Sequence, residues 1–152
     1  MTVSDSARTP RQRWLAVLAR APQEALARAV AQWLPAGCDE VVRAPECGMV
    51  MLRGRVGGTG DAFNLGEATV TRCAVRVDAH LGVGYVLGRS REQARLVATL
   101  DALLQEPRLH GRLLGELVEP LARQQAGERA QRSREVASSR VEFFTMVRGD
   151  AA

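Results

Sequence analysis

The middle of the chain contains one run of strand-forming sequence after another, with no helical periodicity between them. The candidate strands are residues 40–43, 48–56, 67–77 and 81–87. The tripeptide Asp78-Ala79-His80 supplies a tight connection between the last two. Parallel strands need long crossover connections, usually helices, whereas antiparallel strands can be joined by short turns. The sequence therefore predicts a central antiparallel meander.

A glycine-dense connection follows the strand at residues 48–56, and the whole stretch 54–77 is the most unusual part of the chain. Consecutive backbone amides can form an anion-binding nest, which would suit phosphate. However, Gly57-Gly58-Thr59-Gly60 matches neither the GxGxxG pattern nor GxxxxGK[ST]. The following residues look extended, so no helix N-terminus would support an anion there. These features favour a wide hairpin connection over a phosphate cradle.

Helix-start signals precede the strands. Thr9 is a good N-cap, with Pro10 at the first helical position and Gln12 placed to complete a capping box. Pro22 restarts a second helix with an apolar face. We therefore expect an N-terminal helical hairpin packed on the rest of the domain.

Further helix signals follow the strands. Ser90 and Gln93 form a second capping box, and Pro107 begins the next helix. Pro120 should kink or break that helix near Glu119. The predicted fold class is thus α+β, with an N-terminal helical hairpin, a central antiparallel sheet meander, C-terminal helices and an extended apolar tail.

At 152 residues the chain is long enough for one domain with a real core, and we expect a single domain over residues 1–152. No apolar run approaches the roughly 20 residues that cross a bilayer, and the start lacks the apolar centre of a signal peptide. A cytoplasmic protein without membrane contact is expected. Three cysteines and two histidines, all widely spaced, predict neither a disulfide framework nor a metal site.

All 21 basic residues are arginine, and they give a net charge of +4. The absence of lysine excludes a Walker A lysine, a Schiff base and a lysine general base. Arginine binds phosphate well through its planar donor fork. A bias toward arginine on a solvated surface explains the composition on its own, however, and is the favoured interpretation. A nucleic-acid-binding module is the alternative class. It is disfavoured because aromatics are only 4% and no recognition helix is evident.

The predicted strand at residues 48–56 has one face whose residue types are unusual for a surface that contacts only solvent. Met49, Met51, Arg53 and Arg55 share it. Methionine and arginine are enriched at interfaces, so this face suits a partner. The other possibility is that helices of the same chain cover the methionines while the arginines lie in water.

No paired carboxylates, catalytic triad or nucleophile with a base is visible, so no catalytic residue is predicted. Arginines on neighbouring strands, including Arg76, could form a basic patch for an anion. The candidates for facing an anion or substrate are Arg53, Arg55, Thr69, Thr71 and Arg72. Cys73 adjoins Arg72, but neighbouring strand residues point to opposite faces, which favours a buried structural thiol.

Residues 122–152 combine a highly charged helical segment with an apolar end. A helix this polar either bridges solvent or docks on another chain. We expect this region to dock on partner subunits, although the end could instead fold back as an edge strand. The candidate docking residues are Phe143, Phe144, Met146 and Arg148.

Four segments together resemble the PhnG family, the G subunit of the bacterial carbon–phosphorus lyase system. They are GMVMLRGRVGGTG at 48–60, FNLGE at 63–67, TVTRCAV at 69–75 and FFTMVRG at 143–149. The order of helices and strands matches as well, so the resemblance covers nearly the whole chain.

The resemblance implies an accessory subunit of a core complex with the H, I and J subunits, acting with an ABC-type L protein. That assembly starts phosphonate breakdown, in which methylphosphonate displaces adenine from ATP to give α-D-ribose 1-methylphosphonate 5-triphosphate. ATP and methylphosphonate would be substrates of the complex, with no cofactor held by this chain alone. The resemblance carries over no catalytic residue, which agrees with the residues themselves.

Overall fold

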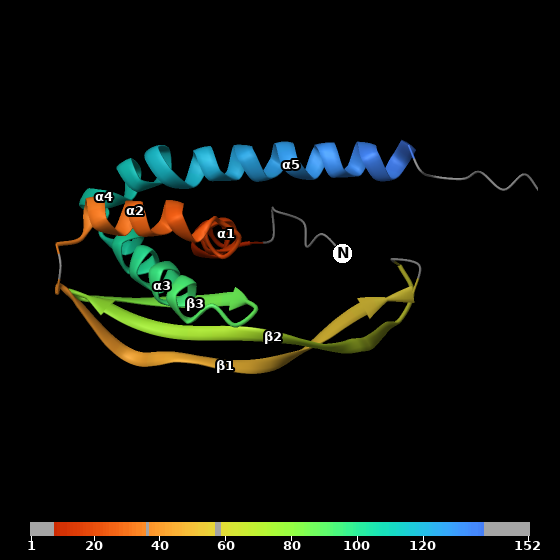
Figure 1. The fold of residues 1–152 in the computed structure, drawn as a ribbon, viewed down its shortest axis with the longest axis horizontal. Helices are drawn as coiled ribbons and strands as arrows, with labels where there is room; N and C mark the ends of the chain where they lie inside the picture. Colours follow the sequence, from red (N-terminus) through yellow and green to blue (C-terminus); the bar gives the residue numbers. More distant parts are fainter. Residues whose placement is uncertain (1–7, 36, 57–58, 139–152) are drawn as a thin grey trace, which may run out of the picture.

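The computed structural model describes residues 8–35, 37–56 and 59–138. It is an α+β fold, in which a three-stranded antiparallel sheet of order β1-β2-β3 lies under a layer of helices (Figure 1). The elements are α1 (Pro10–Leu18), α2 (Gln23–Trp33), β1 (Asp39–Arg55), β2 (Ala62–Val77), β3 (His80–Leu87), α3 (Arg91–Gln105), α4 (Pro107–Leu113), the π-helical turn η3 (Leu114–Val118) and α5 (Glu119–Ser138).

The predicted meander is confirmed, but its strands are longer than expected. The separate strands predicted at 40–43 and 48–56 form the single strand β1, which has irregular register on either side of Arg43, close to Pro45. Proline cannot donate a ladder hydrogen bond, but an edge strand with a bulge accommodates it. Strand β2 begins at Ala62, so residues 62–66 belong to the sheet and not to a loop. Asp78 has φ 51° in the two-residue turn from β2 to β3.

Helix α3 packs directly on β2 and β3 and contributes more buried core residues than any other described element. The buried side chains of β2 alternate with exposed ones, so Cys73, Val75 and Val77 face the helical layer. On β3 the helix-facing positions include Gly82 and Gly84. A Cβ at Gly84 would collide with the backbone oxygen of Ala94 on α3, and one at Gly82 with backbone atoms of the same helix. These glycines therefore let the helix approach the sheet closely.

The capping boxes form to different extents. At α1 both halves are present, with the Thr9 hydroxyl accepting from the Gln12 amide and the Gln12 side chain accepting from the Thr9 amide. At α3 only the Ser90 half is present. The Gln93 side chain instead donates to the carbonyl oxygens of Ala19 and Ala21, at 3.4 and 3.1 Å. Gln93 therefore ties α3 to the connection between α1 and α2, both of which pack on α3.

The predicted disruption at Pro120 takes the form of a π-helical turn, and the helix continues beyond it. The amide of Glu119 donates to the oxygen of Leu114, five residues back. Proline lacks the amide that would continue the α-helical ladder, so a wider turn just before it is a natural accommodation. From there α5 runs for 20 residues.

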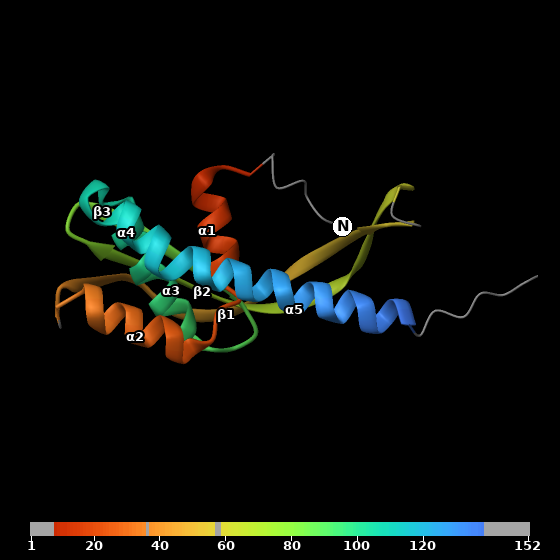
Figure 2. The ribbon, with the colours of Figure 1, turned by 90° about the horizontal axis from the view of Figure 1, so that it is seen from above.

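Two elements project from the core in the same direction (Figures 1 and 2). One is α5, and the other is the distal β1–β2 ribbon, residues 48–55 and 62–69, here called the arm. Most side chains of the arm are exposed. Among the described residues, no helix has the length and apolar character needed to cross a membrane.

Candidate functional site

The arginines predicted to face an anion are separated by the sheet geometry. Arg53 and Arg55 lie on the arm, where Arg55 Nη1 donates to the oxygen of Gly60 at 3.1 Å. Arg72 lies nearer the core, and its Nε contacts Glu46 Oε1 at 2.6 Å. Arg76 likewise contacts Glu40 at 3.1 Å. Two of the four arginines are thus paired with carboxylates from β1.

The two threonines also differ in their surroundings. Thr71 is buried on the face opposite Arg72, and its hydroxyl donates to the oxygen of Gly88 at 2.7 Å. Thr69 lies at the base of the arm, with its carbonyl oxygen accepting from the Gly88 amide at 2.8 Å. The structure therefore brings no shared anion site together from these five candidates, and contact between any of them and substrate stays a prediction.

The arm presents large apolar side chains to solvent. Met49 is 68% exposed and Met51 51% exposed. Helices of the described chain therefore do not cover the methionines, and that explanation of this face is wrong. Further exposed apolar residues of the arm are Leu52, Phe63 and Leu65. A two-stranded ribbon without a packed face is marginal in water, so this surface has the character of an interface.

Arg53, Arg55, Met49 and Met51 belong to the same arm, so the interface character extends to the predicted methionine and arginine face. The predicted docking residues Phe143, Phe144, Met146 and Arg148 lie outside the described residues. The described part of the polar segment is helical, as α5, and exposed over nearly its whole length.

The sequence did not indicate a perturbed thiol at Cys47, which lies beside Thr71 and Arg91. Cys47 Sγ is 3.4 Å from Thr71 Oγ1, and the residue is exposed. The hydrogen bond with Thr71 and the neighbouring Arg91 lower the pKa of Cys47 from its ordinary value. Arg91 is 44 residues away, so only the register that pairs Cys47 with Thr71 and Thr71 with Val86 would have revealed this arrangement.

Cys73 is the buried structural thiol that the strand alternation predicts. It is 3% exposed, and its Sγ donates to the oxygen of Arg43 at 3.3 Å. Burial raises the pKa of the Cys73 thiol. Among the described residues, no three side chains of the metal-binding types come together.

The two cysteines are therefore expected to differ in alkylation rate. A lowered pKa keeps a thiolate fraction at Cys47 down to lower pH, whereas burial and a raised pKa protect Cys73. With iodoacetamide at neutral pH, Cys47 should react at least about tenfold faster than Cys73. Peptide mass spectrometry measures each site. Equal rates in the folded protein would contradict the assignment, and in urea the rates should converge.

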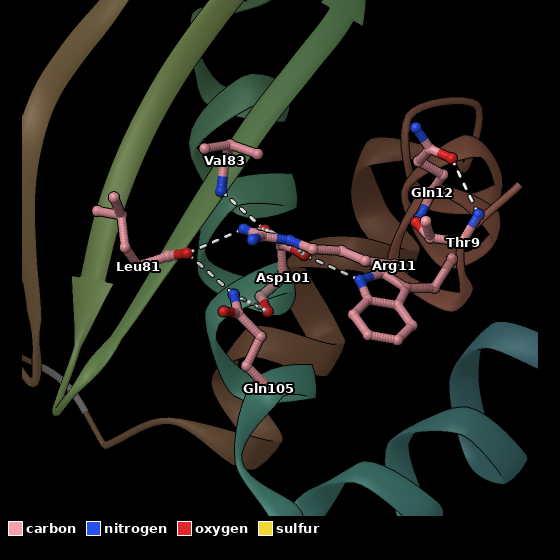
Figure 3. A network of polar contacts seen from close by, with 8 residues as sticks. Thr9, Arg11, Gln12, Leu81, Val83, Asp101 and Gln105 are labelled. Atoms are coloured by element: carbon pink, nitrogen blue, oxygen red, sulfur yellow. Dashed lines mark hydrogen bonds and ion pairs between the residues drawn. The ribbon is translucent and has the colours of Figure 1, made fainter.

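Among the described residues, Asp101 of α3 is the one charged residue that is buried, and no pattern in the sequence had indicated it (Figure 3). Its carboxylate accepts hydrogen bonds from Arg11, from Trp14 Nε1 at 2.8 Å and from the Val83 amide at 2.9 Å. Arg11 also donates to the oxygen of Leu81 at 2.9 Å. This network joins α1, α3 and the free edge of β3. Because its hydrogen bonds hold three packed elements together, we assign it a structural role.

Comparison with known proteins identifies the family. The family model described as "Phosphonate metabolism protein PhnG" matches residues 9–149. A protein of Rhizobium meliloti (strain 1021), named alpha-D-ribose 1-methylphosphonate 5-triphosphate synthase subunit PhnG, is 47% identical over 110 residues. That alignment covers 72% of this chain and 70% of the relative. The match spans the strands, the arm and the helices described above, and it shows that this chain belongs to the PhnG family of phosphonate metabolism proteins.

Proposed function

We propose that this chain is a non-autonomous subunit of an α-D-ribose 1-methylphosphonate 5-triphosphate synthase of the transferase class. In the proposed reaction, a methylphosphonate oxygen forms a bond to C1′ of the ribose of ATP. The bond from C1′ to the adenine nitrogen breaks, and adenine leaves with that electron pair. The name of the Rhizobium meliloti relative supports this assignment.

The observation that carries the proposal is the exposed apolar surface of the arm. A domain that acted alone would gain nothing from a ribbon with Met49, Met51 and Leu65 in water, the last 64% exposed. Burying such side chains against another chain contributes about 25 cal/mol for each Å² removed from water. Contact between the arm and another subunit would therefore stabilise both the ribbon and the complex.

We propose the H, I and J subunits of the carbon–phosphorus lyase core complex, and the ABC-type L protein, as the partners. The chain supplies no catalytic residue in this proposal. ATP and methylphosphonate bind to the complex, and the catalytic groups belong to other subunits. This chain contributes contacts with the other subunits. It makes them through the arm, and through α5 together with the segment that follows α5.

The test is the double variant Met49→Asp/Met51→Asp, co-expressed with the H, I and J subunits. Two carboxylates buried at the interface should weaken assembly by at least about 100-fold, because truncating or charging a few central apolar residues removes most interface energy. Affinity pull-down measures assembly. Synthesis of the triphosphate product from ATP and methylphosphonate should fall in parallel.

The matched control is Gln32→Asp, which places one carboxylate on an exposed position of α2 away from the arm. Circular dichroism should show that both variants fold, since exposed substitutions usually change stability by less than about 0.5 kcal/mol. Normal co-purification of the double variant would refute docking through the arm. Turnover by the isolated wild-type chain would refute a non-autonomous role.

A further inference from the structure

A cavity of about 430 Å³ lies between α1 and the η3–α5 segment. Residues at helical spacing on one face of α1 and on one face of the η3–α5 segment line this cavity. From α1 come Trp14 and Val17, and from the opposite side come Leu114, Val118 and Ala122. The contact between Gln125 Nε2 and the oxygen of Val17, at 2.9 Å, holds α5 against α1 beside it. The cavity thus has an apolar floor between two helical segments that are joined by a hydrogen bond.

Arginines surround this apolar floor. Arg8, Arg13, Arg20 and Arg129 line the cavity, and Glu119 is its one acidic lining residue. Among the described residues, no carboxylate lies within ion-pair distance of Arg13, Arg20 or Arg129. This contrasts with the arginines of the sheet, three of which, Arg43, Arg72 and Arg76, are paired with β1 carboxylates.

Two of these side chains are partly fixed by their own helices. Arg20 Nε donates to the oxygen of Ala16 at 2.9 Å, and Arg129 Nε donates to that of Gln125 at 3.2 Å. Their terminal nitrogens make no further hydrogen bond within the described residues. A smaller hollow of about 220 Å³ shares Arg20 and Arg129 with the cavity and adds one cation, Arg132, and one carboxylate, Glu128.

The π-helical turn η3 supplies two lining residues, Leu114 and Val118. Such turns are frequent at functional sites, because they displace side chains from the ordinary helical positions. The cavity volume is in the range that holds small organic ligands, which usually contact a mostly apolar wall and a few polar groups. Guanidinium groups recognise phosphate oxygens through paired donors.

We propose that this cavity binds a small phosphate-bearing molecule with a flat or apolar body, of the nucleotide class. The phosphates contact Arg13, Arg20 and Arg129, and the body lies on the floor beside Trp14 and Val118. A concave floor of this size suits a small molecule better than a protein segment. The inference gives the chain a ligand of its own and goes beyond the proposed role in assembly.

The test is isothermal titration calorimetry on the full chain with ATP and with inorganic triphosphate, at constant ionic strength. Both probes should bind saturably, and ATP more tightly, since its base and ribose also contact the apolar floor. The variant Arg13→Ala/Arg129→Ala should weaken both by at least about tenfold, because each lost charge-assisted hydrogen bond contributes roughly that much or more.

The matched control is Arg28→Ala/Arg123→Ala. It removes the same two charges, from exposed positions on α2 and α5 that do not line the cavity. Its affinity should stay within about twofold of wild type, since exposed charges act weakly at a distance.

Three results would overturn the proposal. They are no binding of either probe, equal losses in both double variants, and binding of triphosphate that the nucleoside does not improve. Because the isolated chain is measured, failure here would leave the docking of the arm untouched, and failure of docking would leave this site untouched.

Discussion

Replacing Asp101 by alanine should lower the free energy of unfolding by about 3 kcal/mol, because buried hydrogen-bond donors are then left without an acceptor. The Asp101 side chain is fully buried. The indole of Trp14 and the amide of Val83 both donate to it, and each would lose its partner. Arg11 is 40% exposed, so water compensates part of its loss. Urea unfolding followed by circular dichroism measures the change.

Two further variants separate the charge from the hydrogen bonds. Asp101→Asn keeps one acceptor oxygen but turns an amide NH₂ toward donors. Its free energy of unfolding should therefore fall measurably, but by less than that of the alanine variant. Asp61→Ala removes an exposed aspartate beside the arm tip and should change stability by less than about 0.5 kcal/mol. An Asp101→Ala variant within about 1 kcal/mol of wild type would contradict the role of the network.

Features encoded locally were predictable from the sequence. The Thr9 cap, the short Asp78 turn and the apolar stripe of α3 each depend on residues within a few positions of one another. The antiparallel order followed from the lack of helices between strands. The length of β1 did not, because Pro45 looks like a terminator until the partner strand shows the irregular pairing around it.

The candidate surfaces were less predictable because they depend on pairing and burial. The sequence placed Met49 and Arg53 on one strand, as the structure confirms, but could not show that the strand extends beyond the helical layer. Nor could it show that Glu46 lies against Arg72, since the two are 26 residues apart. The cationic cavity was missed for the same reason, because it combines Arg13 and Arg129 from opposite ends of the chain.

The close approach of α3 to β3 gives the second large effect. Gly84→Ala should lower the free energy of unfolding by about 3 kcal/mol, at the upper end of the usual overpacking cost. The new methyl group would meet the backbone oxygen of Ala94, and a helix backbone cannot move aside as a flexible side chain can. Alanine is otherwise a better strand residue than glycine. Strand propensity alone would therefore raise the free energy of unfolding, and it cannot explain a decrease. Gly82→Ala/Gly84→Ala should prevent folding.

The control is a glycine-to-alanine substitution at a position where the new methyl group contacts no other atom. A Cβ at Gly111 of α4 meets nothing within 4 Å, and alanine is the better helix former. Gly111→Ala should therefore raise the free energy of unfolding by about 0.5 to 1 kcal/mol. Opposite signs for the two alanine variants, measured by urea unfolding, would locate the cost in the contact between α3 and β3. A Gly84→Ala protein as stable as wild type would mean that α3 does not approach β3 closely enough at Ala94 to exclude a methyl group.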